Sequence, residues 1–318
     1  MRADSAPAAR LSSDSRSCQI SVVIPTRNRR EMLERCLAAL ARQTLGLDRF
    51  EVIVVNDGGA PLERLLSNWR NRLRLRILDQ SHGGPAAARN AGAAVAHGSL
   101  LAFTDDDCEP HPDWLTACTI RLHETPEHAI GGHTQNVLCD NPYSSASQLL
   151  VDYLYDYQRT IDDRPGTRPK MPAFVTSNNL AVSAALFSQL GGFDQSFRRA
   201  AAEDRDFCER WQERGYQLSH VPAAVVRHGH ALTLGSFWQQ HVNYGRGAHT
   251  LRRARAARGT TRGGLEPLSF YVGLLTYPRR TRSLKTPVLI ALLAVSQVAN
   301  AFGFALEAAR TAITPPHR

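Results

Sequence analysis

The sequence contains six cysteines in 318 residues, but none of them forms a C-x-x-C pair. That spacing is the usual mark of a zinc site, so a zinc site is disfavoured, and a reducing compartment is the default expectation. Residues 1–17 have no apolar run that could serve as a signal peptide, and their polar composition predicts disorder. No internal repeat or long heptad run occurs, which argues against a solenoid and a coiled coil.

Acidic residues are in deficit, with 29 Asp and Glu against 38 Lys and Arg, so the net charge is +9. A basic chain suits nucleic acid, an anionic membrane surface or an anionic substrate. No nucleic-acid-binding motif is present, so we do not expect that partner. Many arginines fall late in the chain and predict a patch: Arg246, Arg252, Arg253, Arg255, Arg258, Arg262, Arg279, Arg280 and Arg282.

Apolar runs and helical patterns alternate through the first third of the chain. Residues 19–25 (QISVVIP), 51–56 (EVIVVN) and 100–103 (LLAF) predict buried strands, and 73–77 predicts a strand nearer a sheet edge. Apolar residues at helical spacing follow the runs at 19–25, 51–56 and 73–77, and they predict helices at 30–43, 62–69 and 86–97. This order predicts a doubly wound α/β sheet with parallel strands.

The pattern changes after residue 110. Helices are predicted at 112–124 and 144–160, an extended segment at 129–138, and a strand interrupted by polar residues at 174–182. A helix opens at Glu203, and a short strand is predicted at 223–226. Residues 162–172 contain three prolines and a glycine, which is typical of either a lid or a plain surface loop.

Polar clusters follow three of the predicted strands, and Asp105, Asp106 and Asp107 form the most acidic one. Thr26 to Asn28 and Asp57 with Gly58 are the others. Ligands of such sheets bind at the carboxyl ends of strands, and adjacent carboxylates suit Mg²⁺ or Mn²⁺. The alternative for the acidic triplet is a solvated turn.

Taken together, these segments resemble glycosyltransferase family 2, the inverting nucleotide-sugar transferases of GT-A fold. The resemblance rests on SVVIPTRNR (21–29), VIVVNDG (52–58), GGPAAARNAG (83–92), LAFTDDD (101–107), GGFD (191–194) and AEDRDFCER (202–210). It covers residues 19–230. It implies a GT-A type, Rossmann-like mixed sheet flanked by helices.

The resemblance also implies roles for individual residues. The donor nucleotide would be bound by Pro25, Thr26, Arg27, Asn28, Asp57, Gly58, Gly84, Arg89, Asn90, Asp105 and Asp106. A divalent cation, Mg²⁺ or Mn²⁺, would be held by Asp107, with Asp105 and His228 as further ligands. A structural histidine is the alternative for His228.

Catalysis would fall to an acidic pair. Asp204 matches the family's base, and Glu203 would position the acceptor or the base. Two acids at a helix start are also favoured by the helix dipole, which is the plain structural interpretation. Asn178, Asn179 and Trp211 are candidates for contact with the acceptor or the donor sugar.

Beyond the resemblance, residues 235–258 predict a basic helix with interleaved aromatic residues, and 287–306 carry no charge. The second stretch is long enough to span a bilayer, to lie in its interface or to pack on the catalytic domain. The cations at 279–285 would keep the catalytic domain cytoplasmic. We therefore expect a C-terminal helical membrane-associating extension.

The predicted protein is a metal-dependent inverting glycosyltransferase at the cytoplasmic membrane face. Its donor would be a nucleotide sugar, with UDP favoured and GDP or dTDP possible, and its acceptor a glycan, a lipid-linked sugar or a small molecule. The alternative is a non-catalytic nucleotide-sugar-binding or scaffold protein. The expected division is a disordered 1–17, a catalytic domain at 18–232 with halves 18–110 and 111–232, and a helical region at 233–318.

Overall fold

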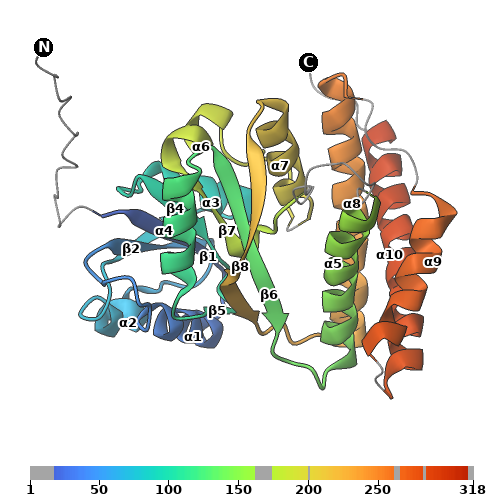
Figure 1. The fold of residues 1–318 in the computed structure, drawn as a ribbon, viewed down its shortest axis with the longest axis horizontal. Coiled ribbons are helices and arrows are strands. Elements are labelled where there is room, and N and C mark those ends of the chain that lie inside the picture. The colour runs from blue at the N-terminus through green and yellow to red at the C-terminus, as the bar shows by residue number, and fades with distance from the viewer. Residues whose placement is uncertain (1–17, 162–173, 200, 261–265, 282–283, 314–318) are drawn as a thin grey trace, which may run out of the picture.

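The computed structural model describes residues 18–161, 174–199, 201–260, 266–281 and 284–313. The N-terminal residues expected to be disordered and the proline-rich segment 162–172 lie outside this part of the chain. Within it, one mixed sheet has helices on both faces, and a group of long helices stands at its side (Figure 1). The mixed α/β sheet confirms the expected fold class.

The sheet has eight strands in the order β3-β2-β1-β4-β7-β6-β8-β5. Parallel pairing joins β3, β2, β1 and β4, while β7 runs antiparallel to both β4 and β6. The strands are β1 Ile20–Thr26, β2 Phe50–Asp57, β3 Leu75–Gln80, β4 Leu100–Phe103, β5 Cys108–Pro110, β6 His128–Asn136, β7 Leu180–Ser183 and β8 Gln217–His228.

The parallel half matches the pattern expected from the sequence. Every residue of β2 is buried, because helices cover the sheet on both faces, and β3 lies at the sheet edge. Right-handed crossovers bring the carboxyl ends of β1, β2 and β4 to one edge. The helices are α1 Arg30–Leu40, α2 Glu63–Leu66, α3 Pro85–Ala94, α4 Trp114–Glu124, α5 Pro142–Ile161, α6 Ala184–Leu190, α7 Glu203–Glu213, α8 Leu234–Ala257, α9 Leu268–Thr276 and α10 Thr286–Ile313.

Two expected strands differ from the structure. The segment expected to be an interrupted strand is a 3₁₀ turn, Ser177–Asn179, followed by the four residues of β7. The strand expected at 223–226 is the end of the twelve-residue β8, whose pairing with β6 shifts register between Gly132 and His133. Buried and exposed residues do not alternate regularly along β8, so the strand lacks the period of two on which strand prediction depends.

Helices α8 and α10 pack closely along their lengths beside α5 and α9 (Figure 1). Gly245 on α8 and Gly303 on α10 make this approach possible. A side chain at Gly245 would collide with the backbone of Asn300, and one at Gly303 with the backbone of Val242. Small residues at a helix crossing let the backbones approach. Helix α10 is therefore docked on α8.

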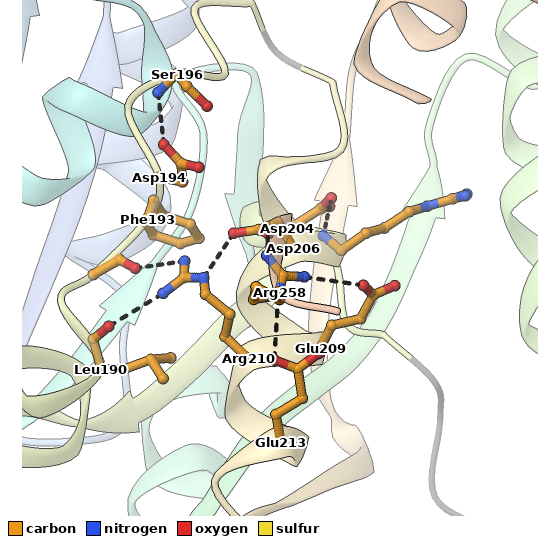
Figure 2. A network of polar contacts seen from close by, with 12 residues as sticks. Leu190, Phe193, Asp194, Ser196, Asp204, Asp206, Glu209, Arg210, Glu213 and Arg258 are labelled. Atoms are coloured by element: carbon orange, nitrogen blue, oxygen red, sulfur yellow. Dashed lines mark hydrogen bonds and ion pairs between the residues drawn. The ribbon is translucent and has the colours of Figure 1, made fainter. Parts of the chain in front are cut away.

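A network of ion pairs fastens α7 to its neighbours (Figure 2). The carboxylate of Asp206 is fully buried and accepts from Arg210 on its own helix and from Arg258, just beyond α8, both at 2.7 Å. Arg210 also donates to the carbonyls of Leu190 and Gly192. The start of α7 is thereby held against both α8 and the loop after α6.

Candidate active site

The acidic triplet lies where β4 ends and is tied to the end of β1. Asp106 is buried and accepts a 2.7 Å hydrogen bond from the Thr26 hydroxyl. Arg29 donates to Asp106 at 3.2 Å and to Asp107 at 3.1 Å. Burial raises the pKa of Asp106 to about 6, against the opposing effect of Arg29. Asp106 thus joins two strand ends and faces inward.

Asp107 faces the end of β8. Its Oδ1 lies 3.3 Å from Nε2 of His228, because β5, which begins at the next residue, pairs with β8. Despite burial, His228 and Arg29 lower the pKa of Asp107, and Asp107 raises the pKa of His228. Asp107, Cys108 and His228 bring ligand atoms within 4.8 Å of one another.

These residues fit a hard divalent cation. A carboxylate oxygen and an imidazole nitrogen are ligands that Mn²⁺ accepts, with the remaining positions left for phosphate oxygens. Burial raises the pKa of the Cys108 thiol well above its ordinary value, which disfavours the thiolate form that binds metals. Asp105 lies outside this group and turns toward Arg89 instead.

Arg89 connects the two halves of the site. It lies on α3, and its guanidinium is almost fully buried, with a side chain only 3% exposed. One nitrogen donates to Asp105 at 2.7 Å and another to Glu203 at 3.0 Å. A charge-assisted bridge of this kind holds its partners in a defined geometry. The acidic triplet and the acidic pair are therefore parts of one site.

The acidic pair begins α7. Ala202, directly before it, has φ of +67°, a left-handed conformation that costs energy for a residue with a side chain. Glu203 is buried, and burial together with Asp204 raises its pKa to about 7 in spite of Arg89. Burial also raises the pKa of Asp204, which is more exposed than Glu203 and accepts from the Arg205 amide.

Asp57 ends β2 and holds the loop that precedes α3. Its two carboxylate oxygens accept from Gln80, His82 and the amides of Gly83 and Gly84, at 2.7 to 2.9 Å. These bonds lower its pKa although burial opposes them. A carboxylate offers about four acceptor positions, so the loop occupies all of them.

Two models of known protein families match this chain. The family model described as "Glycosyl transferase family 2" matches residues 21–180, and "Glycosyl transferase family group 2" matches 101–306. The chain belongs to glycosyl transferase family 2. Membership accounts for the order of the strand-end motifs, and it confirms the resemblance drawn from the sequence.

Among curated family members, the chain is 30% identical over 231 residues to validoxylamine A glucosyltransferase of Streptomyces hygroscopicus, covering 65% of this chain and 53% of that one. The chain thus spans about half the length of that relative. It is 27% identical over 240 residues to glycosyltransferase AglE of Haloferax volcanii, covering 72% of each.

Solved structures support the fold. A mannosyltransferase from Pyrobaculum calidifontis, in complex with GDP-Man and Mn²⁺, aligns with a TM-score of 0.57 at 20% identity, over 93% of this chain and 80% of that one. Staphylococcus aureus TarS with UDP-GlcNAc aligns at 0.52 and 15% identity, over 92% of each. At this identity the likeness concerns the fold, which is that of the GT-A neighbours.

The structure brings most of the family motif residues to one edge of the sheet, but it places Asn90, Asn179 and Trp211 differently from our expectation. Asn90 exchanges two hydrogen bonds with the backbone of Phe193, so it anchors the loop after α6. Asn179 is buried and bonds to Trp114 and to the Ala224 carbonyl. These amides are occupied in structural contacts.

Trp211 is the clearest correction. It is fully buried on α7, and its indole N–H donates to the carbonyls of Glu127 and Gln217. It therefore belongs to the core and does not face a substrate. Asn178, in contrast, is only partly buried, and its side-chain oxygen has no hydrogen-bond partner. It remains a candidate for substrate contact.

Arg29 is the main residue that sequence reasoning did not assign to the site. Its guanidinium lies between Asp106 and Asp107, with a side chain 47% exposed. A cation three residues after the end of β1 was a usable signal, because strands of a parallel sheet present their carboxyl ends together.

Proposed function

We propose that this protein is a glycosyltransferase that moves a sugar from a nucleoside-diphosphate donor to a hydroxyl acceptor, with inversion at the anomeric carbon. The observation that carries the proposal is the bridge from Arg89 to Asp105 and Glu203. It joins the donor-side strand end to the acidic pair, as a displacement between two substrates requires. The relatives named above support the same activity.

The donor would lie across the ends of β1, β2 and β4. Arg27 and Asn28 would border the nucleotide there, and the partly exposed Asp105 would face it. A base N–H can reach Asp57 only by displacing one of its present donors. His82 is the donor most easily displaced, since its side chain is 51% exposed. We infer that His82 moves when the nucleotide binds.

Asp107 and His228 would hold Mn²⁺ or Mg²⁺, whose positive charge would stabilise the leaving diphosphate. Arg29 would add a further positive charge on the same side, since it already contacts Asp107. Both ligands come from the ends of paired strands, so their spacing is set by the sheet.

Asp204 would act as the general base. It accepts the proton of the acceptor hydroxyl while that oxygen bonds to the anomeric carbon, and the bond from that carbon to the diphosphate breaks. Its greater exposure compared with Glu203 favours it for this role. Its raised pKa strengthens it as a base. Glu203, held by Arg89, would position the first turn of α7.

The apolar outer face of α10 supports attachment to a membrane. The helix is long and apolar enough to span a bilayer, and 33% of the residues in its most apolar stretch are buried against the rest of the protein. Its exposed face carries Val288, Val298, Phe302 and Leu306, and Trp238 of α8 lies beside Phe302. Because the opposite face is docked on α8, we propose that α10 lies in the membrane interface and does not cross it.

A ligand screen tests the proposed function. Thermal unfolding should be measured with UDP, GDP, dTDP and their sugars, each with and without Mn²⁺. A ligand that binds only the folded state raises its stability, so we expect one nucleotide series to raise the melting temperature in a Mn²⁺-dependent way. Slow hydrolysis of the matching nucleotide sugar should accompany binding. Binding without any turnover would favour a non-catalytic protein.

A further inference from the structure

A large cationic cavity lies beside the donor position and is not used by the proposed reaction. Its volume is about 740 Å³, and the loop after α6, helix α8 and the last turns of α10 form its walls. It shares His82 with the loop that Asp57 holds, and Ala201, which nearly adjoins Glu203, also lines it. The cavity thus borders both the donor position and the acidic pair.

Five arginines line this cavity, against two carboxylates. Arg198, Arg199 and Arg253 are exposed and form no ion pair with any residue that the structure describes. Uncompensated cations around a concave surface favour a ligand of opposite charge. The two other arginines are Arg246 and Arg310, and the acids are Asp194 and Glu307.

Buried polar atoms without partners also line the same cavity. Arg246 Nε, His249 Nδ1 and Glu307 Oε2 make no hydrogen bond in the structure, and all three residues belong to the lining. Glu307 is only 4% exposed, and its Oε2 is 3.9 Å from Arg246 Nε, too far for a hydrogen bond. Buried polar groups of this kind are normally satisfied, so they indicate a polar ligand.

The cavity is separate from the position expected for the donor diphosphate. Its lining includes neither the residues after β1 nor any member of the acidic triplet nor His228. A diphosphate held at Asp107 would therefore leave the cavity open. The positive charge of the cavity is therefore available to a different group.

We propose that this cavity binds a phosphoryl group carried by the acceptor. The inference rests on the proposed function, because it names the acceptor's chemical class. Arginine forks match phosphate oxygens, and several of them suit a multiply charged group. The buried Glu307 and His249 would contact hydroxyl groups next to that phosphate. Burial and Arg253 lower the pKa of His249, which keeps its ring neutral and able to accept.

Binding of inorganic phosphate tests this site directly. Calorimetry should be run in Mg²⁺ with the donor position saturated by the nucleoside diphosphate that the ligand screen identifies, on the wild type and on Arg199→Gln/Arg253→Gln. Both arginines are exposed, so the fold should persist. Arg252→Gln is the matched control, since Arg252 neighbours Arg253 on α8 but does not line the cavity.

We expect phosphate affinity to fall about tenfold or more in the double variant, because charge-assisted hydrogen bonds are lost, and to stay within about twofold in the control. Absence of phosphate binding by the wild type would overturn the proposal. Equal weakening in the control would do the same, because it would indicate a general charge effect. The affinity for that nucleoside diphosphate, measured on the same wild-type sample, reports separately on the proposed function.

Two vesicle preparations distinguish the sources of the phosphate. One contains phosphatidylcholine alone, and the other adds a polyprenyl monophosphate. A lipid-borne acceptor predicts that wild-type protein prefers the second preparation and that the double variant loses this preference. A soluble acceptor predicts no preference in either protein while inorganic phosphate binding still requires both arginines.

Discussion

Nη1 of Arg89 donates to Oε1 of Glu203 at 3.0 Å, across 114 residues of sequence. Both side chains are buried, so neither charge is compensated by water. A buried ion pair contributes little net stability, but the loss of one partner is costly. The pair therefore acts mainly to hold the start of α7 in a fixed position beside the end of β4.

Protonation of Glu203 leads to the first prediction. Its pKa in the folded chain is about 7, above the ordinary 4.5. Between these two pKa values the folded state holds a proton on Glu203 that the unfolded state has lost, so the free energy of unfolding falls as pH rises. The stabilising contribution of Glu203 is complete below about pH 4.5 and disappears as pH rises through about 7. Glu203→Gln removes the titration, so its melting temperature relative to wild type should rise between about pH 5 and about pH 8. A constant difference would contradict the assignment.

Replacement of the base is the second prediction. Asp204→Asn should keep the fold, because the side chains are nearly equal in size and asparagine is tolerated near helix starts. Nucleotide-sugar affinity should be unchanged, while the transfer rate at saturating donor should fall about 10²–10⁴-fold, because an amide cannot accept the proton. Glu203→Gln should be less damaging. If Glu203→Gln is inactive and Asp204→Asn is normal, the two roles are exchanged.

Metal dependence supplies the third prediction. Asp107→Ala should lower turnover by at least about a hundredfold, because the leaving diphosphate loses its counter-charge. It should also abolish the Mn²⁺-dependent part of the nucleotide thermal shift. The measurement is turnover and melting temperature with Mn²⁺ and with EDTA. A variant that works at the wild-type rate in EDTA would show that Asp107 holds no metal.

The fourth prediction concerns the network in Figure 2, where Arg258 pairs with buried Asp206. Arg258→Ala should lower the free energy of unfolding by about 2 kcal/mol, because a charged hydrogen bond to a buried carboxylate is lost. Arg252→Ala is the comparison, since Arg252 only lies over the Phe304 ring and should cost about 1 kcal/mol or less. Chemical denaturation measures both. Equal losses would mean that the network does not hold α7.

Membrane attachment through α10 gives the fifth prediction. Val298→Ser with Phe302→Ser should weaken binding to anionic vesicles about tenfold or more, since each exposed apolar side chain contributes on burial. Ile120→Ser is the control, because Ile120 is an exposed apolar residue on α4 that is 55% exposed. Co-sedimentation with vesicles measures the effect. Retained binding by the double variant would place the contact elsewhere.

The sequence by itself determined the parallel half of the sheet, the family and the identity of the acidic groups. Apolar runs such as β2, buried along its whole length, identify strands because period and composition are local properties. The position of Asp107 and Asp204 also followed from local motifs, since each lies at the end or the start of an element. Local patterns of this kind are enough to predict which single residues have a chemical role.

Only the tertiary structure decided how these groups meet. The pairing of β5 with β8 brings His228 to Asp107, and α3 packing brings Arg89 to Glu203. The same packing places Trp211 in the core, because its side of α7 faces the sheet. It also brings four separate segments together around the arginine cavity. Contacts between residues far apart in sequence depend on burial and register, which no local pattern specifies.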